Sequence, residues 1–420
     1  MRLFPSQTRY PIEFAFLALL ILFLPSFEAP KNIFWAAYVI TWFVNRFRDK
    51  DFGGKWKAWD TLIVTWIASG YIVAAFAGFQ HHEWLGANDI LRYGSILWLV
   101  MRSRVAESEL RTLLTITIAS AVLALALGVW SLYVTHKTTA LQLHSVGHVN
   151  HSAIYLAIIY GASLTLTLAY WKNSRALWQS LSVLVTATLA IALIISDSRA
   201  ALGAGLILTL IIGLIWLRRS LRTVIALFAI TLVAAGLAYF GQTSIIKKIE
   251  SRIDGNNTLA GRIEIWNAAK EAWRKYPLFG VGMNNYGKIS VKHVAQWRAE
   301  RNETFESGRY LGNGHAHSLY FNTLAERGIF GFSILILVLL AWAATLARHL
   351  PRRDHSNLYW ALWGGSFSAW FVTVGIGAFN TTLHHEHAIL SMLLLGFWLS
   401  HLYRPGFSMD HPRESNPPTT

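Results

Sequence analysis

The stretch GHAHSLYFNTLAERGIFGFSILILVLLAWAATLA, residues 314–347, decides the fold of this chain. It begins as a polar loop and passes into an apolar run that is long enough to cross a bilayer, which takes about 20 residues. Two imidazoles, His315 and His317, are therefore expected where an extramembrane loop re-enters a membrane. Histidine has an unperturbed pKa near neutrality, so the pair suits proton chemistry at the bilayer surface.

The composition of the whole chain indicates the same class of protein. Of its 420 residues, 54% are hydrophobic and 14% are charged, and 19 are Trp. This is the composition of a polytopic membrane protein rather than of a soluble domain. The chain has no Cys, which excludes disulfide and thiolate chemistry. No convincing cleavage site follows the first apolar run, so we expect a retained span rather than a signal peptide.

The apolar runs predict an all-α protein with about twelve transmembrane helices. An even number of spans leaves both chain termini on one side of the membrane. The expected spans are 11–27, 31–46, 59–79, 88–102, 110–134, 151–171, 177–195, 200–217, 221–240, 322–347, 358–379 and 387–403.

Basic residues in the connecting loops orient this bundle. Short cytoplasmic loops are enriched in Lys and Arg, and the even-numbered loops are the basic ones. The short odd-numbered loops at 81–84 and 380–386 contain no Lys or Arg, so they are expected to face outward. The net charge of +15 is thus attributed first to membrane orientation, and no nucleic acid partner is expected. The basic residues are Arg46, Arg48, Lys50, Lys55, Lys57, Arg102, Arg104, Arg111, Lys172, Arg175, Arg218, Arg219, Arg222, Arg348, Arg352 and Arg353.

The chain divides into four predicted parts. Residues 1–240 hold helices 1–9, 241–316 form an outward loop domain, 317–403 hold helices 10–12, and 404–420 form a disordered cytoplasmic tail with four prolines. The loop domain has twelve Lys and Arg against seven Asp and Glu. Long loops escape the charge rule, so this excess either suits an anionic partner such as a lipid phosphate or simply solvates the surface.

Within the loop domain, a helix is predicted to begin near Gly261. Ile263, Trp266, Ala269 and Trp273 share one helical face. The sequence Pro277-Leu278-Phe279-Gly280-Val281-Gly282 ends this helix and forms turns. Arg262 is then expected in the first helical turn, where exposed amides favour an anion.

Three further groups of polar residues are expected on the outer side. Arg199, at the end of the seventh span, either belongs to a site, pairs with Asp197, or snorkels to the interface. Asn150, in Gly147-His148-Val149-Asn150-His151, either lines the same cavity or caps a helix. The quartet His384-His385-Glu386-His387 either binds a transition metal or has a supporting role.

The chain resembles the O-antigen ligase and polymerase superfamily of bacterial envelope glycosyltransferases. The resemblance rests on the layout of spans and long loop, which is GT-C-like, and on motifs over roughly the C-terminal half. These motifs are Ser198-Arg199, Gly261-Arg262, the Pro277 to Gly282 segment, His317-Ser318 and Gly328-Ile329-Phe330-Gly331.

This resemblance implies a metal-independent transfer of a glycan from undecaprenyl diphosphate on the periplasmic face of the inner membrane, with no cofactor. In a ligase, the acceptor is a sugar hydroxyl of lipid A-core. The essential histidine of the family corresponds to His317, and its two arginines correspond to Arg199 and Arg262. His315 corresponds only weakly. An O-antigen polymerase or a protein O-oligosaccharyltransferase of the same superfamily is the alternative.

The chemistry of these residues is consistent with that implication. Displacing a diphosphate builds negative charge, which arginine binds bidentately while it stays ionised. His317 would take the proton of the acceptor hydroxyl, although it could instead cap the tenth span. A transporter of a polyprenyl-linked lipid remains an alternative, but no repeated halves are evident and the polar signals lie at the outer surface.

Overall fold

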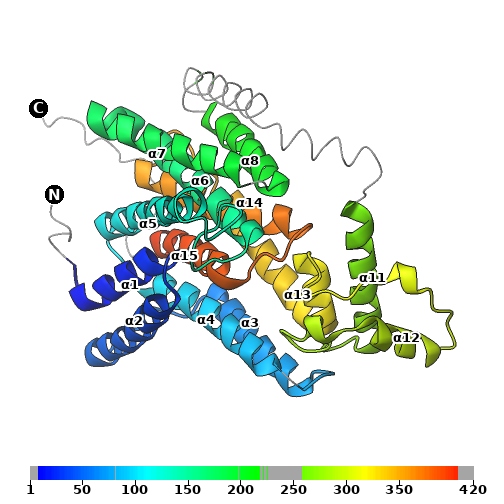
Figure 1. The fold of residues 1–420 in the computed structure, drawn as a ribbon. Coiled ribbons are helices and arrows are strands. Elements are labelled where there is room, and N and C mark those ends of the chain that lie inside the picture. The colour runs from blue at the N-terminus through cyan, green and yellow to red at the C-terminus, as the bar shows by residue number, and fades with distance from the viewer. Residues whose placement is uncertain are drawn as a thin grey trace, which may run out of the picture.

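The computed structural model describes residues 8–80, 82–196, 198–217 and 258–404, together with Leu221 and Ile225. No strand occurs in these ranges, and the predicted all-α class is confirmed (Figure 1). The helices are α1 (Pro11–Phe23), α2 (Glu28–Asp49), α3 (Ala58–Phe76), α4 (Glu83–Arg102), α5 (Glu107–Tyr133), α6 (Val149–Tyr170), α7 (Ala176–Ile195), α8 (Arg199–Leu217), α11 (Thr258–Lys275), α12 (Val291–Ala299), α13 (Leu319–Arg348), α14 (Asn357–Gly377) and α15 (His385–Leu402).

The structure supports a multi-pass membrane protein but does not confirm twelve spans. Among the described helices, α3, α5, α6, α7, α8 and α13 are long and apolar enough to cross a membrane. The other predicted spans that fall on described residues are helical as well. The ninth predicted span, 221–240, lies almost entirely outside the described residues, as does the tail after Arg404. The full number of spans stays a prediction.

Helix α6 lies in the middle of the bundle, next to α14 and α15 (Figure 1). In its most apolar window, 94% of the residues are buried, against 17% in α7. Small residues allow α6 and α14 to approach closely: a Cβ at Gly161 would lie 2.3 Å from Ser368 Oγ, and one at Gly364 would lie 2.3 Å from Thr165 Cγ2. This is the packing expected where lipid supplies no hydrophobic drive between helices.

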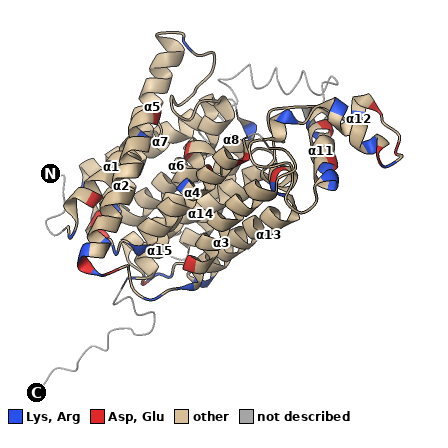
Figure 2. Ribbon diagram, turned by 90° about the horizontal axis from the view of Figure 1, so that it is seen from below, with Lys and Arg blue, Asp and Glu red and all other residues tan. Residues whose placement is uncertain are grey.

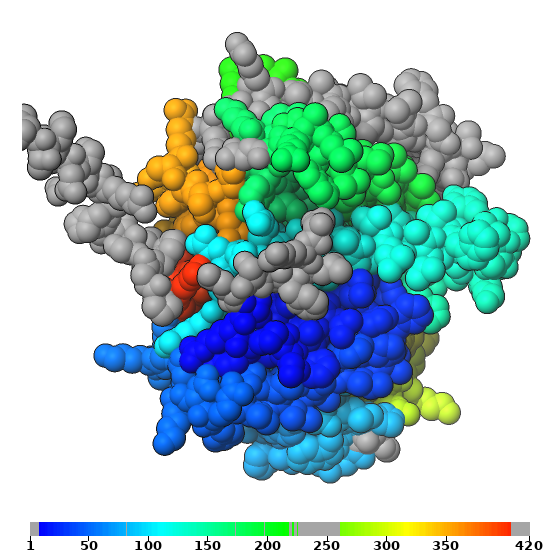
Figure 3. Space-filling model, turned by 90° about the vertical axis from the view of Figure 1, so that its left-hand side faces the viewer, coloured from blue at the N-terminus to red at the C-terminus, as the bar shows by residue number. Residues whose placement is uncertain are grey.

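Charged residues gather at the ends of the bundle and on α11 and α12 (Figure 2). Two of the basic loop residues that indicated orientation are buried in ion pairs. Arg46 Nη2 lies 2.9 Å from Glu13 Oε1, and Arg102 Nε lies 2.6 Å from Asp60 Oδ1. These pairs join α1 to α2 and α3 to α4. Figure 3 shows α1 and α2 (blue) on one side of this face and α7 (green) on the other.

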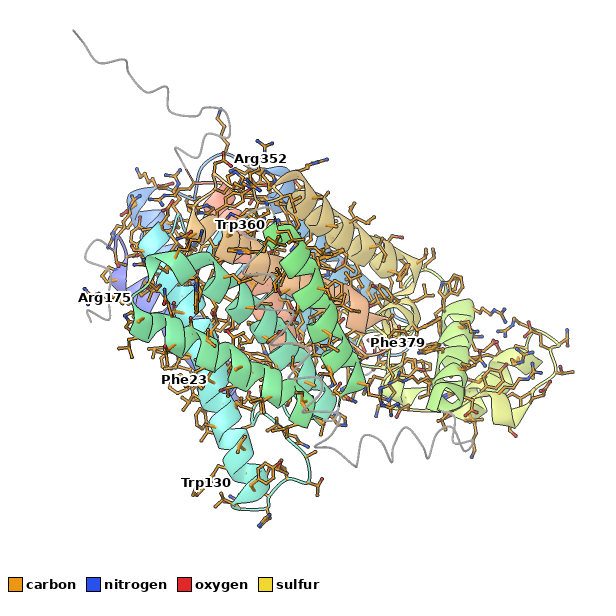
Figure 4. All side chains as sticks on the ribbon, turned by 90° about the horizontal axis from the view of Figure 1, so that it is seen from above. Phe23, Trp130, Arg175, Arg352, Trp360 and Phe379 are labelled. Atoms are coloured by element: carbon orange, nitrogen blue, oxygen red, sulfur yellow. The ribbon has the colours of Figure 1, made fainter. Side chains whose placement is uncertain are left out.

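The helices α11 and α12 extend from one end of the bundle (Figure 1). Figure 4 places Arg352 at the opposite end of α14 from Phe379, which is on the side of α11. The two helices have their own small core, built by Ile265, Ala268, Ala269, Ala272, Val281, Tyr286, Ile289, Val294 and Trp297. Glu271 is buried beneath it and pairs with Arg274, Arg298 and Arg301.

Two expectations for α11 are wrong in detail. Helix α11 begins at Thr258, so Arg262 lies one turn further along than predicted. The residues Thr258 to Ala260 continue the helix before Gly261, and the backbone N–H of Arg262 is then no longer among the unpaired amides of a helix start. Ile263 is 51% exposed, and Ile265 and Ala268 are buried instead. Ala269 of the predicted face is buried in this core as expected, so Ile263 is the position of that face that is wrong.

Candidate active site

The segment with the two histidines is held between α11 and α13. Trp266 Nε1 on α11 donates a hydrogen bond to the Ala316 carbonyl at 3.0 Å. The Ala316 N–H donates to Asn322 Oδ1 on α13, also at 3.0 Å. Hydrogen bonds thus fix the backbone of Ala316 from both α11 and α13, and with it the positions of its neighbours His315 and His317. Their ring centroids are 4.3 Å apart.

His317 does not cap α13, so that alternative is wrong. The cap is Ser318, whose side chain accepts a hydrogen bond from the Phe321 N–H and donates one to the Gly377 carbonyl. His317 itself adopts φ +47°, in the left-handed region that non-glycine residues visit rarely. The backbone strain of such residues tends to concentrate at functional sites. Because Ser318 caps α13, the side chain of His317 is not used as the cap.

Both imidazoles are held in the neutral form near pH 7. Burial lowers the pKa of His317 to about 4, with further contributions from the charges of His315, Arg262 and His148. Burial, together with His148, also lowers the pKa of His315. A neutral imidazole has a free lone pair at physiological pH, which a general base requires. The charge of Arg262 thus acts on His317, and the role of Arg262 at the site stays a prediction.

Asn150 lies in the first turn of α6, beside the histidine pair. It is not the helix cap: the cap is His148, whose Nδ1 accepts a hydrogen bond from the Asn150 N–H at 3.2 Å. The alternative of a cap by Asn150 is therefore wrong, because the side chain two residues earlier already satisfies that amide. Asn150 stays a predicted substrate-binding residue.

Arg199 begins α8 with an exposed side chain. The charge of Arg262 contributes to the lowered pKa of His317, and Arg199 is not among the described residues that do so. Asp197 lies outside the described residues, and so does the predicted pair of Asp197 with Arg199. The role of Arg199 stays a prediction.

Two glycine motifs that are far apart in the sequence are joined by backbone hydrogen bonds. The N–H of Val281 donates to the Ala325 carbonyl at 2.9 Å, and the N–H of Ile329 donates to the Pro277 carbonyl at 2.8 Å. Gly328 interrupts α13 with φ 58° and ψ −166°. A Cβ on Gly328 would lie 2.3 Å from the Leu278 carbonyl oxygen. These motifs therefore fix the end of α11 against the helix that follows the histidine pair.

The structure brings together histidines that the sequence kept in separate segments. His151, at the start of α6, lies with its ring centroid 6.2 Å from His315, 6.1 Å from His384, 5.7 Å from His385 and 5.1 Å from His387. The only signal in the sequence was their shared predicted side of the membrane. Within the described ranges, no group of three or more His, Asp or Glu side chains is placed to hold a metal ion.

A further link that the sequence did not reveal joins α2 to this region. Lys31 and Glu386 form an ion pair, and both side chains are 4% exposed. Ser145 Oγ also donates to Glu386 Oε1 at 3.1 Å. A buried charge is costly unless it is paired, so this pair fixes the start of α15, with its histidines, against α2.

The fold and this site define a multi-pass helical membrane protein whose titratable site lies at one end of the bundle, beside the helical unit of α11 and α12. Residues 183–336 match the family model described as O-antigen ligase. The match confirms the resemblance to the O-antigen ligase and polymerase superfamily. The matched range includes Arg199, Arg262, His315 and His317, and Asn150 lies before it.

A Haemophilus influenzae protein described as an uncharacterized protein is 27% identical over 99 residues. That stretch covers 24% of this chain and 23% of the Haemophilus protein. The chain therefore matches less than a quarter of this relative's length.

Proposed function

We propose that this protein is an O-antigen ligase, a glycosyltransferase of lipopolysaccharide biosynthesis in the bacterial inner membrane. It transfers O-antigen polysaccharide from undecaprenyl diphosphate to a sugar hydroxyl of lipid A-core on the periplasmic face. The observation that carries the proposal is the neutral His315 and His317 pair beside Arg262, within the region that matches the family.

The proposed reaction is a direct displacement. The acceptor hydroxyl attacks the anomeric carbon of the glycan, the bond from that carbon to the phosphate oxygen breaks, and the diphosphate leaves with the bonding electrons. His317 takes the hydroxyl proton, a role that contributes roughly 10²–10⁴-fold to the rate. Direct attack inverts the anomeric centre.

Arginine supplies the charge that the leaving diphosphate requires. Arg262 and Arg199 bind its oxygens, since a guanidinium forms bidentate contacts with phosphate and stays protonated. Arg262 has a second effect, because its charge lowers the pKa of His317. Arg262 thus binds the donor and adds to burial, the main cause, in keeping the base unprotonated. This arrangement needs no metal ion.

The test is reconstitution of purified protein with undecaprenyl-diphosphate-linked glycan and lipid A-core in the presence of EDTA. Transfer is followed by a gel shift of the acceptor, and the product linkage by NMR. We expect transfer by the wild type, a rate reduced roughly 10²-fold or more in His317→Ala, and wild-type activity in His136→Ala. His136 is an exposed control outside the histidine cluster.

Two parallel reactions test the alternatives, one with a second lipid-linked repeat as acceptor and one with a peptide containing Ser and Thr. Transfer only to the repeat would identify a polymerase, and transfer only to the peptide would identify a protein O-oligosaccharyltransferase. Equal rates for the wild type and His317→Ala would remove His317 from the mechanism.

A further inference from the structure

Four histidines form a connected series from the proposed base to the surface. Successive ring centroids are 4.3 Å apart from His317 to His315, 6.2 Å from His315 to His151, and 5.7 Å from His151 to His385. The series runs from two half-buried rings through His151, which is 8% exposed, to the exposed His385. Rings at these separations are close enough for one bridging water to connect their nitrogen atoms.

In the middle of this series, and in two histidines beside it, a ring nitrogen has no hydrogen-bond partner among the described residues. His151 Nδ1 is buried and has no hydrogen-bond partner among the described residues, and the same holds for Nδ1 of His384 and His387. His387 Nε2 faces the Thr381 carbonyl at 3.4 Å. A carbonyl only accepts, so that nitrogen carries the hydrogen and Nδ1 is an acceptor. Buried polar atoms are normally hydrogen-bonded. Three neighbouring histidines that each have an unpartnered Nδ1 among the described residues therefore call for an explanation.

The need for such a series follows from the charge beside the base. Once His317 has taken a proton, its imidazolium lies near the permanent cation of Arg262. Burial and the neighbouring positive charges disfavour the protonated form, so the proton does not rest there. It must leave before the next turnover.

We propose that His315, His151 and His385 form a proton relay that carries the acceptor's proton from His317 to the outer surface. This inference rests on the proposed function. His317 gives its N–H proton to His315 and recovers its lone pair. His315 passes a proton to His151 in the same way, and His385 releases one to solvent. Each imidazole accepts one proton and donates one, so the series ends neutral.

Charged groups lie at both ends of the series. His148 and Arg262 face the inner end. Around the outer end lie His384, His387 and Glu386, together with Lys31 and Arg92 from α2 and α4. Lys31 pairs with Glu386 Oε1, while Oε2 is without a hydrogen-bond partner among the described residues. Glu386 is the carboxylate that offsets the cations at the outer end.

The experiment measures kcat and KM in the reconstituted transfer reaction for His151→Gln and His385→Gln, with His136→Gln as the control, at a series of imidazole buffer concentrations and pH values. We expect the two relay variants to lose roughly tenfold or more in kcat, which is less than the loss of the base itself. The donor KM stays unchanged. Free imidazole restores kcat in both variants and has no effect on the wild type.

A packing role for His151 gives a different result. It would lower the thermal midpoint of unfolding in detergent, and imidazole would not restore kcat. Because His385 is exposed, its variant tests the relay without that complication. If the wild type transfers glycan while both relay variants match the control, the relay is wrong and the proposed function stands. If the wild type transfers to none of the three acceptors, the proposed function fails and the relay fails with it.

Discussion

Replacing Gly328 with Ala tests whether the contact between the two glycine motifs fixes the site. Gly328 has φ 58° and ψ −166°, a region that essentially only glycine populates, and occupying it costs other residues on the order of 1–3 kcal/mol. The added Cβ would also lie 2.3 Å from the Leu278 carbonyl oxygen. The segment from Pro277 to Leu278 must therefore move away from α13.

That movement breaks two hydrogen bonds, from the Ile329 N–H to Pro277 and from the Phe330 N–H to Leu278, at 2.8 and 3.1 Å. Each contributes about 0.5–1.5 kcal/mol, so strain and lost bonds together destabilise the fold by roughly 2–6 kcal/mol. With an unfolding entropy near ~2.1 cal/mol/K per residue, this lowers the Tm by about 2–7 °C.

The assay is thermal unfolding of the purified protein in detergent, followed by the transfer reaction on the folded fraction. The matched control is Gly375→Ala in α14, where a Cβ meets nothing within 4 Å. A glycine-to-alanine change inside a helix is neutral or stabilising by up to ~1 kcal/mol. Equal midpoints and equal transfer rates for the two variants would refute the proposed role of the contact.

Three further predictions follow from the site and the bundle. The acid limb of kcat/KM is expected near pH 4, because burial and neighbouring charges, Arg262 among them, lower the pKa of His317 to about 4. Arg262→Gln removes one of these charges and moves the limb to higher pH. If the pH profile of this variant shows an unmoved limb, the assignment of His317 as the base is contradicted. Ser318→Ala removes the cap of α13 and lowers stability by about 0.5–2 kcal/mol, which chemical denaturation measures; Ser307→Ala, on an exposed turn, serves as its control. Glu13→Gln leaves the charge of the 2% exposed Arg46 side chain uncompensated, which lowers the free energy of unfolding by roughly 3–5 kcal/mol. The double variant Glu13→Gln, Arg46→Met is expected to recover most of that stability. A double variant as unstable as the single one would argue against the ion pair.

The positions of most helices followed from the sequence alone. A bilayer requires long apolar runs, so the ranges for α3, α5, α7 and α8 agree with the structure to within a few residues. The turns expected at Gly280 and Gly282 are present, and both residues have a positive φ, which glycine adopts without strain. On the predicted apolar face of α11, Ala269 is buried as expected and Ile263 is not, because periodicity predicts a stripe while the packing partner decides which residues it covers.

The sequence by itself determined the all-helical class and most helix positions, because long apolar runs and turn residues act locally, and the resemblance named His317 and Arg262 as candidates for proton transfer and diphosphate binding. Only the tertiary structure decided that His151 lies beside His315 and that His385 lies beside His151. Topology predicts the side of the membrane on which a residue lies, but the distance between two residues depends on helix packing. Here α6 packs closely against α14, and Lys31 and Glu386 form a buried pair. His151 and His315 are more than 150 residues apart in the sequence, yet their ring centroids lie 6.2 Å apart.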